Sequence, residues 1–183
     1  MLTEKPTIAD LARDYAKQAH DGQFRKDGQP YFTHPERVEQ LVRHYKASSK
    51  NIETLCAAAL LHDVLEDFEF TNVTYYDLFE TFRSEIAALV LELTTNPEMK
   101  RGVGDKGEYL SYKLLHMTSW ALVIKLCDRL DNITDMSVCS EEWKRRYADE
   151  TWYIIEYLKK NRKLSPAHGA IIEEIKRKLN SVY

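Results

Sequence analysis

The sequence has 183 residues, of which 44% are hydrophobic, so it is long enough for one compact domain and short for two. Its 26 Lys and Arg residues against 29 Asp and Glu give a net charge of −3, which excludes a general attraction to nucleic acid or to an anionic membrane. Any anionic ligand must therefore be bound by a local cluster of basic residues.

The sequence carries no segment that approaches the roughly 20 consecutive apolar residues of a membrane span, and its polar start lacks the apolar run of a signal peptide. We therefore expect a cytoplasmic protein without a membrane or nucleic-acid partner. The three cysteines, Cys56, Cys127 and Cys139, are odd in number and far apart, which favours reduced packing residues over a disulfide framework or a zinc site. Nothing in the sequence indicates the oligomeric state.

Apolar residues recur at spacings of three and four along most of the chain, beginning with Ile8, Leu11 and Tyr15. This spacing is typical of amphipathic helices that pack on one another. Helix start signals occur in chain order at Thr7 with Asp10, Thr33 with Glu36, Thr74 with Asp77, and Ser165 before Pro166. We predict an all-α fold, a single compact domain over residues 1–183 built as a bundle of about eight helices.

Two stretches interrupt the helical pattern, Asp21 to Thr33 and Asn96 to Gly107, and both are basic and contain glycine and proline. The one β-like stretch, 121–124, runs without a turn into residues that keep helical spacing. We interpret it as a buried helix, although periodicity alone leaves a strand open. The glycines at 102, 104 and 107 spell a dinucleotide-binding fingerprint, but no strand precedes them, so we reject that motif.

The sharpest chemical feature is the stretch 62–67, HDVLED, which follows the apolar run from Leu55 to Leu61. On a continuous helix His62 lies one turn before Glu66 and Asp63 one turn before Asp67, so the two pairs project from neighbouring stripes. Burying these groups without partners costs several kcal/mol, about 2–7 for each unpaired polar group. A bound cation is the simplest partner, and the alternative is a surface patch of salt bridges.

A divalent cation requires further ligands, and two residues on other predicted helices qualify. His34 lies at the start of a helix, and Asp128 lies in an otherwise apolar strip with Asn132 one turn further along. Two imidazoles and two carboxylates form a mixed nitrogen and oxygen set that suits manganese or iron(II). Asp128 could also serve only as a structural ion pair with Arg129.

Other histidines have simpler interpretations. His20 precedes Asp21 and Gly22 at a predicted helix end, where a capping or turn role is favoured. His44, His116 and His168 are isolated, and we assign them no role.

Three segments together resemble RelA/SpoT-type hydrolase domains, from about Ile8 to Met136. The stretch 19–35, AHDGQFRKDGQPYFTHP, is similar to the family's opening motif, 62–67 to its His-Asp and Glu-Asp motifs, and 125–132, KLCDRLDN, to its last metal-ligand segment. The resemblance implies an HD-type metal-dependent phosphohydrolase, here one that removes pyrophosphate from the 3′ position of (p)ppGpp. Because the chain ends at Tyr183, we expect a stand-alone small alarmone hydrolase without a synthetase domain.

The resemblance also implies a role for each matched residue. His34, His62, Asp63 and Asp128 are expected to bind manganese, and Glu66 and Asp67 to serve the chemistry. The residues expected to contact the nucleotide are Arg25, Lys26 and Asn132, with Arg146 and Tyr147 as looser matches. Asp131 departs from the family, whose long members tend to carry histidine there.

The residues themselves support part of this assignment. Arg25 and Lys26 lie on a glycine-bounded loop next to His34, where an arginine can stack on a base and a lysine can meet a phosphate. Lys100, Arg101 and Lys106 on the second basic loop could balance phosphate charge. Both groups could also be solvated loop residues.

Two other functions remain open at this point. The same machinery could act on another nucleotide, as an NADPH 2′-phosphatase or a nucleotide monophosphatase. The chain could also be a non-catalytic nucleotide-binding or antitoxin-like module, although a pure binder need not keep both the ligands and the acidic pair.

Overall fold

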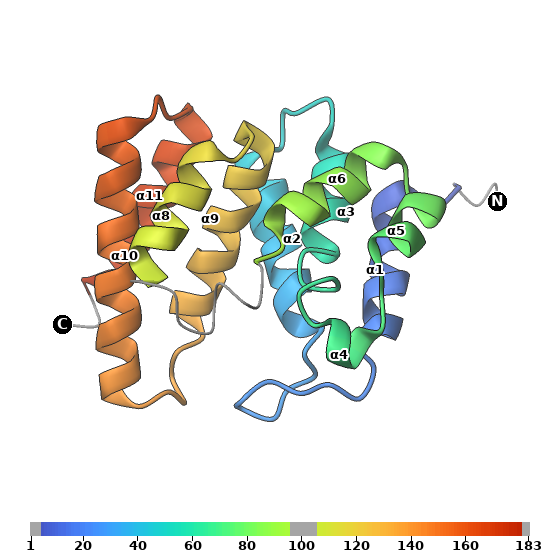
Figure 1. The fold of residues 1–183 in the computed structure, drawn as a ribbon, viewed down its shortest axis with the longest axis horizontal. Helices are drawn as coiled ribbons and strands as arrows, with labels where there is room; N and C mark the ends of the chain where they lie inside the picture. The colour runs from blue at the N-terminus through green and yellow to red at the C-terminus, as the bar shows by residue number, and fades with distance from the viewer. Residues whose placement is uncertain (1–4, 96–105, 181–183) are drawn as a thin grey trace. The chain divides into compact units, whose positions relative to one another are not determined.

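The computed structural model describes residues 5–95 and 106–180. In these ranges it contains ten α-helices and no β-strand apart from one isolated bridge between Phe24 and Pro30, so the predicted all-α class is confirmed (Figure 1). The additional helices relative to the predicted eight include α4, Phe68–Thr71, which is too short to produce a periodic pattern. Among these ten helices none is both long and apolar enough to cross a bilayer.

The chain forms two compact units, Met1–Thr94 and Thr95–Tyr183. The prediction of one domain over the whole chain therefore stays a prediction. In the first unit, helix α3 is central: its residues from Leu55 to Leu60 are completely buried, and it packs against α1, α2 and α6. The helices of this unit are α1 (Ile8–Ala19), α2 (Thr33–Tyr45), α3 (Ile52–Leu60), α4, α5 (Tyr75–Thr81) and α6 (Ser84–Leu93).

Most of the predicted helix starts are confirmed. Thr7 and Thr74 each form a capping box with the aspartate three residues later, and Ser165 caps the helix that begins at Pro166. The predicted cap at Thr33 is wrong, because α2 already includes Thr33. Its hydroxyl donates to the carbonyl oxygen of Pro30 at 2.8 Å, so the side chain is committed to the preceding turn.

The predicted continuous helix through 62–67 is also wrong. Helix α3 ends at Leu60, and residues 61–67 form successive turns. The imidazole Nδ1 of His62 lies 2.7 Å from the carbonyl oxygen of Ala59, which an uninterrupted helix would use for the backbone of residue 63. One helical contact of the predicted spacing is present: the amide of Asp67 donates to the carbonyl of Asp63, four residues earlier, at 3.0 Å.

The first predicted loop is a short hairpin rather than irregular chain. The amide of Arg25 donates to the carbonyl of Gln29 and that of Gly28 to the carbonyl of Arg25, at 2.8 and 3.0 Å. Gly28 has a φ of +83°, as a three-residue hairpin turn with a glycine bulge requires. The hairpin closes at its base, where the amide of Tyr31 donates to the carbonyl of Gln23 at 2.8 Å.

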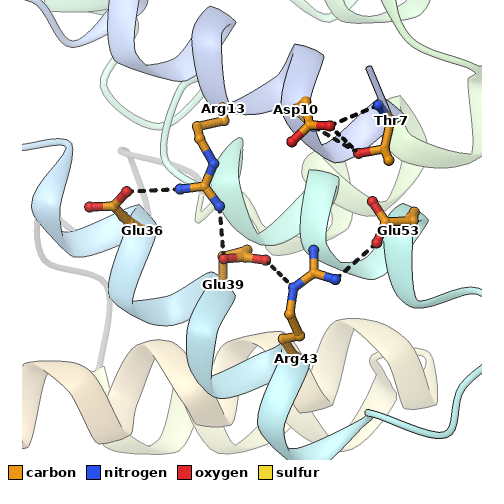
Figure 2. A network of polar contacts seen from close by, with 7 residues as sticks. All are labelled: Thr7, Asp10, Arg13, Glu36, Glu39, Arg43 and Glu53. Carbon is orange, nitrogen blue, oxygen red and sulfur yellow. Dashed lines mark hydrogen bonds and ion pairs between the residues drawn. The ribbon is translucent and has the colours of Figure 1, made fainter. Parts of the chain in front are cut away.

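A charged network joins α1, α2 and α3 (Figure 2). Its centre is Glu39, which is 2% exposed and accepts from Arg13 Nη2 at 3.0 Å and from Arg43 Nε at 2.8 Å. The two arginines extend the network to Glu36 and Glu53, at 2.8 and 2.9 Å. Each of the two carboxylate oxygens of Glu39 thus accepts a hydrogen bond from an arginine, which offsets the cost of burying the charge. The network thus joins α2, which carries His34 in its first turn, to α3, which ends just before His62.

The second unit contains α8 (Lys106–His116), α9 (Ser119–Thr134), α10 (Glu141–Asn161) and α11 (Pro166–Leu179). Helix α9 packs against α11, and α8 against α10. The stretch 121–124 lies in α9 and is buried, so the interpretation as a buried helix is confirmed. His168 is a buried and satisfied residue, bonded through Nδ1 to the amide of Ser165 and through Nε2 to the carbonyl of Ser119.

Candidate metal centre

Three of the four predicted metal ligands come together in the first unit. His34 lies in the first turn of α2, and His62 and Asp63 lie in the turn that follows α3. One ligand atom from each residue lies within 4.8 Å of the others. Oδ2 of Asp63 is 3.1 Å from Nε2 of His62 and 3.7 Å from Nε2 of His34, and the three side chains are 12%, 0% and 3% exposed.

The contact between His62 and Ala59 determines which nitrogen faces Asp63. A carbonyl oxygen only accepts hydrogen bonds, so the Nδ1 atom at 2.7 Å must carry the proton. In the neutral imidazole the lone pair then belongs to Nε2, the atom next to the Asp63 carboxylate. Histidines that bind metals almost always have this arrangement, in which the second nitrogen donates to a carbonyl or carboxylate.

Tyr31 orients the carboxylate of the third candidate ligand. Its hydroxyl donates to Oδ2 of Asp63 at 2.8 Å, and its backbone carbonyl accepts from the amide of His34 at 3.0 Å. Sequence reasoning did not single out Tyr31, although it lies three residues before His34 in the same motif. Through these two contacts Tyr31 connects the hairpin to Asp63 and to His34.

The donor set of this cluster fits a divalent cation. Ligand atoms bound to one ion at about 2.1 Å each lie no more than about 4.2 Å apart. Oδ2 of Asp63 satisfies that limit, at 3.1 Å from Nε2 of His62 and 3.7 Å from Nε2 of His34. Two nitrogens and a carboxylate oxygen suit transition metals better than magnesium or calcium, which prefer oxygen. The residues present therefore fit a metal ion.

The two predicted catalytic acids lie at the end of the same turn. Glu66 and Asp67 are both partly exposed, immediately before helix α4. Oδ2 of Asp67 accepts from the side-chain amide of Gln23 at 2.9 Å, and the other end of that amide lies 2.6 Å from Nδ1 of His20. A hydrogen-bonded chain therefore runs from the end of α1 to Asp67.

His20 is the C-cap residue of α1, so its predicted helix-end role is confirmed. The prediction was incomplete, because the imidazole is 2% exposed and packs on the ring of Tyr31, with 4.8 Å between centroids. Burial lowers the pKa of His20 below its usual value, against the opposing effect of Gln23. The dipeptide His20-Asp21 gave no sign that His20 is connected to Asp67 through Gln23, since Gln23 and Asp67 are far apart in the chain.

Arg25 and Lys26 lie at the tip of the hairpin whose base carries Gln23 and Tyr31. Arg25 is partly exposed and Lys26 is exposed. Both cations therefore belong to the hairpin whose base contacts Asp63 and Asp67. Their contact with a nucleotide stays a prediction.

The fourth predicted ligand, Asp128, lies in the second unit, on α9, and is 7% exposed. Its Oδ2 accepts from Lys125 Nζ at 2.8 Å, and its Oδ1 accepts from the amide of Asn132 at 2.7 Å. The neighbouring Arg129 bonds instead to Thr151 and Glu150, at 2.7 and 3.0 Å. The roles of Asp128 as a ligand and Asn132 as a substrate contact stay predictions.

A cavity of about 700 Å³ lies in the second unit, between residues of α8 and α10. Trp143 and Tyr147 stack beside it with ring centroids 4.9 Å apart, and Arg129 lies 4.8 Å from the centroid of Tyr147. The lining residues are Lys106, Gly107, Trp143, Arg146, Tyr147, Asp149, Glu150 and Tyr153. They include the two loosely matched substrate residues. The sequence also indicated three candidate cations on the second basic loop. Lys106 lies in α8 and forms an ion pair with Glu150 at 3.5 Å, whereas Lys100 and Arg101 lie outside the described residues.

A protein-family model described as "HD domain" matches residues 12–163, a range that takes in most of both units. A probable guanosine-3′,5′-bis(diphosphate) 3′-pyrophosphohydrolase of Mycoplasma pneumoniae is 38% identical over an alignment of 150 positions, which covers 76% of this chain and 20% of that protein. The bifunctional (p)ppGpp synthase/hydrolase SpoT of Escherichia coli is 32% identical over an alignment of 171 positions, which covers 91% of this chain and 22% of that protein. The chain thus spans about a fifth of the length of these curated relatives.

The fold also matches a solved structure, that of a metazoan ortholog of SpoT that hydrolyses ppGpp and plays a role in starvation responses. The TM-score is 0.76 with 24% sequence identity, over 96% of this chain and 97% of that one. At this identity the likeness shows the fold.

Proposed function

The chain belongs to the HD domain family, and on that premise we propose that it is a manganese-dependent hydrolase that removes pyrophosphate from the 3′ position of (p)ppGpp. The cluster of His34, His62 and Asp63 carries this proposal, because the tautomer of His62 and the spacing of the three ligand atoms suit a divalent cation. The activities by which the two curated relatives and the metazoan ortholog are named support the choice of substrate. We place the activity in the cytoplasm.

We propose Asp128 as the fourth ligand, which completes a set of two imidazoles and two carboxylates. This set favours manganese over magnesium, since magnesium prefers oxygen donors in octahedral geometry. A divalent cation held by these residues would supply positive charge and would lower the pKa of a coordinated water well below that of bulk water. The two histidines would bind the metal as neutral imidazoles.

In the proposed reaction, a water oxygen forms a bond to the phosphorus that is joined to the ribose 3′ oxygen. The bond between that phosphorus and the 3′ oxygen breaks, pyrophosphate departs, and the 3′ oxygen takes a proton to leave GDP or GTP. Glu66 and Asp67 are the acid and base residues that hold these protons, one accepting from water and the other donating to the 3′ oxygen.

Cationic and aromatic groups are proposed to bind the nucleotide. The guanidinium of Arg25 and the ammonium of Lys26 suit a base and a phosphate respectively. In the second unit, Tyr147 and Arg146 line a cavity large enough for part of a nucleotide, where an aromatic ring can stack on a purine. Asn132 is the remaining proposed contact.

The decisive experiment measures pyrophosphate release from ppGpp by the purified protein after metal removal with EDTA, with manganese, magnesium or zinc added back. We expect release with manganese and little with magnesium. The same assay on NADPH and deoxynucleotides distinguishes a different phosphohydrolase, because those substrates yield phosphate. Hydrolysis of NADPH but not ppGpp would contradict the proposed substrate, and binding of ppGpp without turnover of any nucleotide would contradict the enzyme.

A further inference from the structure

The base of the hairpin contacts two of the three carboxylates in the turn that follows α3, those of Asp63 and Asp67. Gln23 and Tyr31 face each other across the hairpin, joined by a backbone hydrogen bond of 2.8 Å. The side chain of Tyr31 bonds to Asp63, and the side chain of Gln23 bonds to Asp67. One cross-strand pair thus reaches a proposed ligand and a proposed proton-handling residue, four positions apart in the chain.

The chemistry of these partners determines how the Gln23 amide is oriented. An ionised carboxylate only accepts, so the amide nitrogen must face Oδ2 of Asp67 at 2.9 Å. The amide oxygen then faces Nδ1 of His20 at 2.6 Å, and Nδ1 must carry a proton. Each hydrogen bond therefore has a defined direction. The His20 imidazole donates to the Gln23 amide oxygen, and the Gln23 amide nitrogen donates to the Asp67 carboxylate.

His20 itself is held firmly in place. Its ring is 2% exposed and packs on Tyr31, and its Nε2 atom is buried without a hydrogen-bond partner among the described residues. A buried imidazole with one unsatisfied nitrogen is costly, roughly 1–3 kcal/mol. A hydroxyl-free aromatic side chain would fill the same space without that cost, so the Nδ1 donor is the feature that distinguishes histidine at this position.

We propose that Gln23 is a positioning residue for the reaction: it connects His20 to Asp67 and holds the Asp67 carboxylate in the orientation required for proton transfer. This inference rests on the proposed function and assigns to Gln23 and His20 a role that acts through Asp67. Asp67 requires such a restraint because it is partly exposed and lies in a turn rather than within a helix. The amide can bridge an imidazole donor and a carboxylate, whereas a glutamate at position 23 would place a like charge beside Asp67.

The kinetic test compares Gln23→Ala with Gln29→Ala, a matched control that removes the same side chain from an exposed position of the same hairpin. We expect Gln23→Ala to lower kcat for ppGpp by about 10- to 100-fold, the usual effect of losing a partner that orients a site residue. KM, bound manganese and the thermal midpoint should remain close to those of the wild type, as they should for Gln29→Ala. A change confined to KM or to metal content would overturn the proposal.

A double-mutant cycle tests whether Gln23 acts through Asp67. In an Asp67→Asn background, Gln23→Ala should leave the residual kcat unchanged within about twofold, because the residue it positions no longer serves the chemistry. Multiplication of the two losses would show that Gln23 acts elsewhere and would overturn the proposal.

A measurement without turnover separates this inference from the proposed function. In ¹⁵N-labelled wild-type protein, the His20 ring should show the tautomer protonated at Nδ1, and the side-chain amide of Gln23 should give a pair of resonances that shifts in Asp67→Ala. A His20 ring protonated at Nε2, or Gln23 resonances unaffected by Asp67→Ala, would overturn the positioning role. Failure of the wild type to hydrolyse ppGpp would instead contradict the proposed function, while the resonances still decide the hydrogen-bonded chain.

Discussion

Nδ1 of His62 donates a hydrogen bond of 2.7 Å to the main-chain carbonyl oxygen of Ala59, three residues earlier. This one contact has two consequences. It occupies a carbonyl that the helix would otherwise use, at the point where α3 ends. It also leaves the Nε2 lone pair next to Asp63, the arrangement that metal-binding histidines usually have.

His62→Ala should therefore abolish both manganese binding and turnover. Manganese at 100 times its Kd should stabilise the wild type by about 2.7 kcal/mol, seen as a rise in the thermal midpoint. The variant should show no such rise, and no metal should remain after gel filtration. His44→Ala, which removes an exposed histidine, serves as the control and should behave like the wild type. A metal-dependent rise that persists in His62→Ala would exclude His62 as a ligand.

Tyr31→Phe should weaken manganese binding without preventing folding. The change removes the hydroxyl that donates to Asp63 at 2.8 Å while keeping the ring that packs on His20. Losing an orienting hydrogen bond to a ligand typically reduces metal affinity by about 10-fold or more. Isothermal titration with manganese measures the effect, with Tyr76→Phe, at an exposed tyrosine of α5, as the matched control. Equal affinities for the two variants would contradict the orienting role.

The charged network of α1, α2 and α3 predicts a contrast between two glutamates (Figure 2). Glu39→Ala leaves Arg13 and Arg43 without their shared buried partner, but both are partly exposed and can be rehydrated. We expect a loss of about 1–3 kcal/mol in the free energy of unfolding. Glu36→Ala removes a more exposed partner of Arg13 and should cost less than about 1 kcal/mol. Urea unfolding of both variants measures the difference, and equal losses would show that burial of Glu39 adds nothing.

The cysteines should differ sharply in reactivity. Burial raises the pKa of Cys56 to about 12 and also raises the pKa of Cys127, whereas Cys139 is partly exposed. At pH 8 a thiol with a pKa of 12 is ionised in roughly one molecule in 10,000, and its burial also blocks access. Iodoacetamide should therefore label one thiol per native chain and all three in denaturant. Rapid labelling of Cys56 or Cys127 in the native protein would contradict this packing.

Several features of the protein follow from residues close together in the chain. Capping boxes at Thr7, Thr74 and Ser165 and the buried helix through 121–124 were predicted correctly, because each depends on contacts within one or two turns. The end of α3 was predicted incorrectly. Helical spacing alone cannot show that a side chain will compete for the carbonyl of Ala59.

The amino-acid sequence by itself determined the helical class and the kinds of ligand available, since periodicity, caps and the donor chemistry of His34, His62 and Asp63 are local properties. Only the tertiary structure decided that these three residues share one small volume and that Gln23 reaches Asp67. His34 and His62 are 28 residues apart in the chain, Gln23 and Asp67 are 44 apart, and no local spacing encodes such contacts.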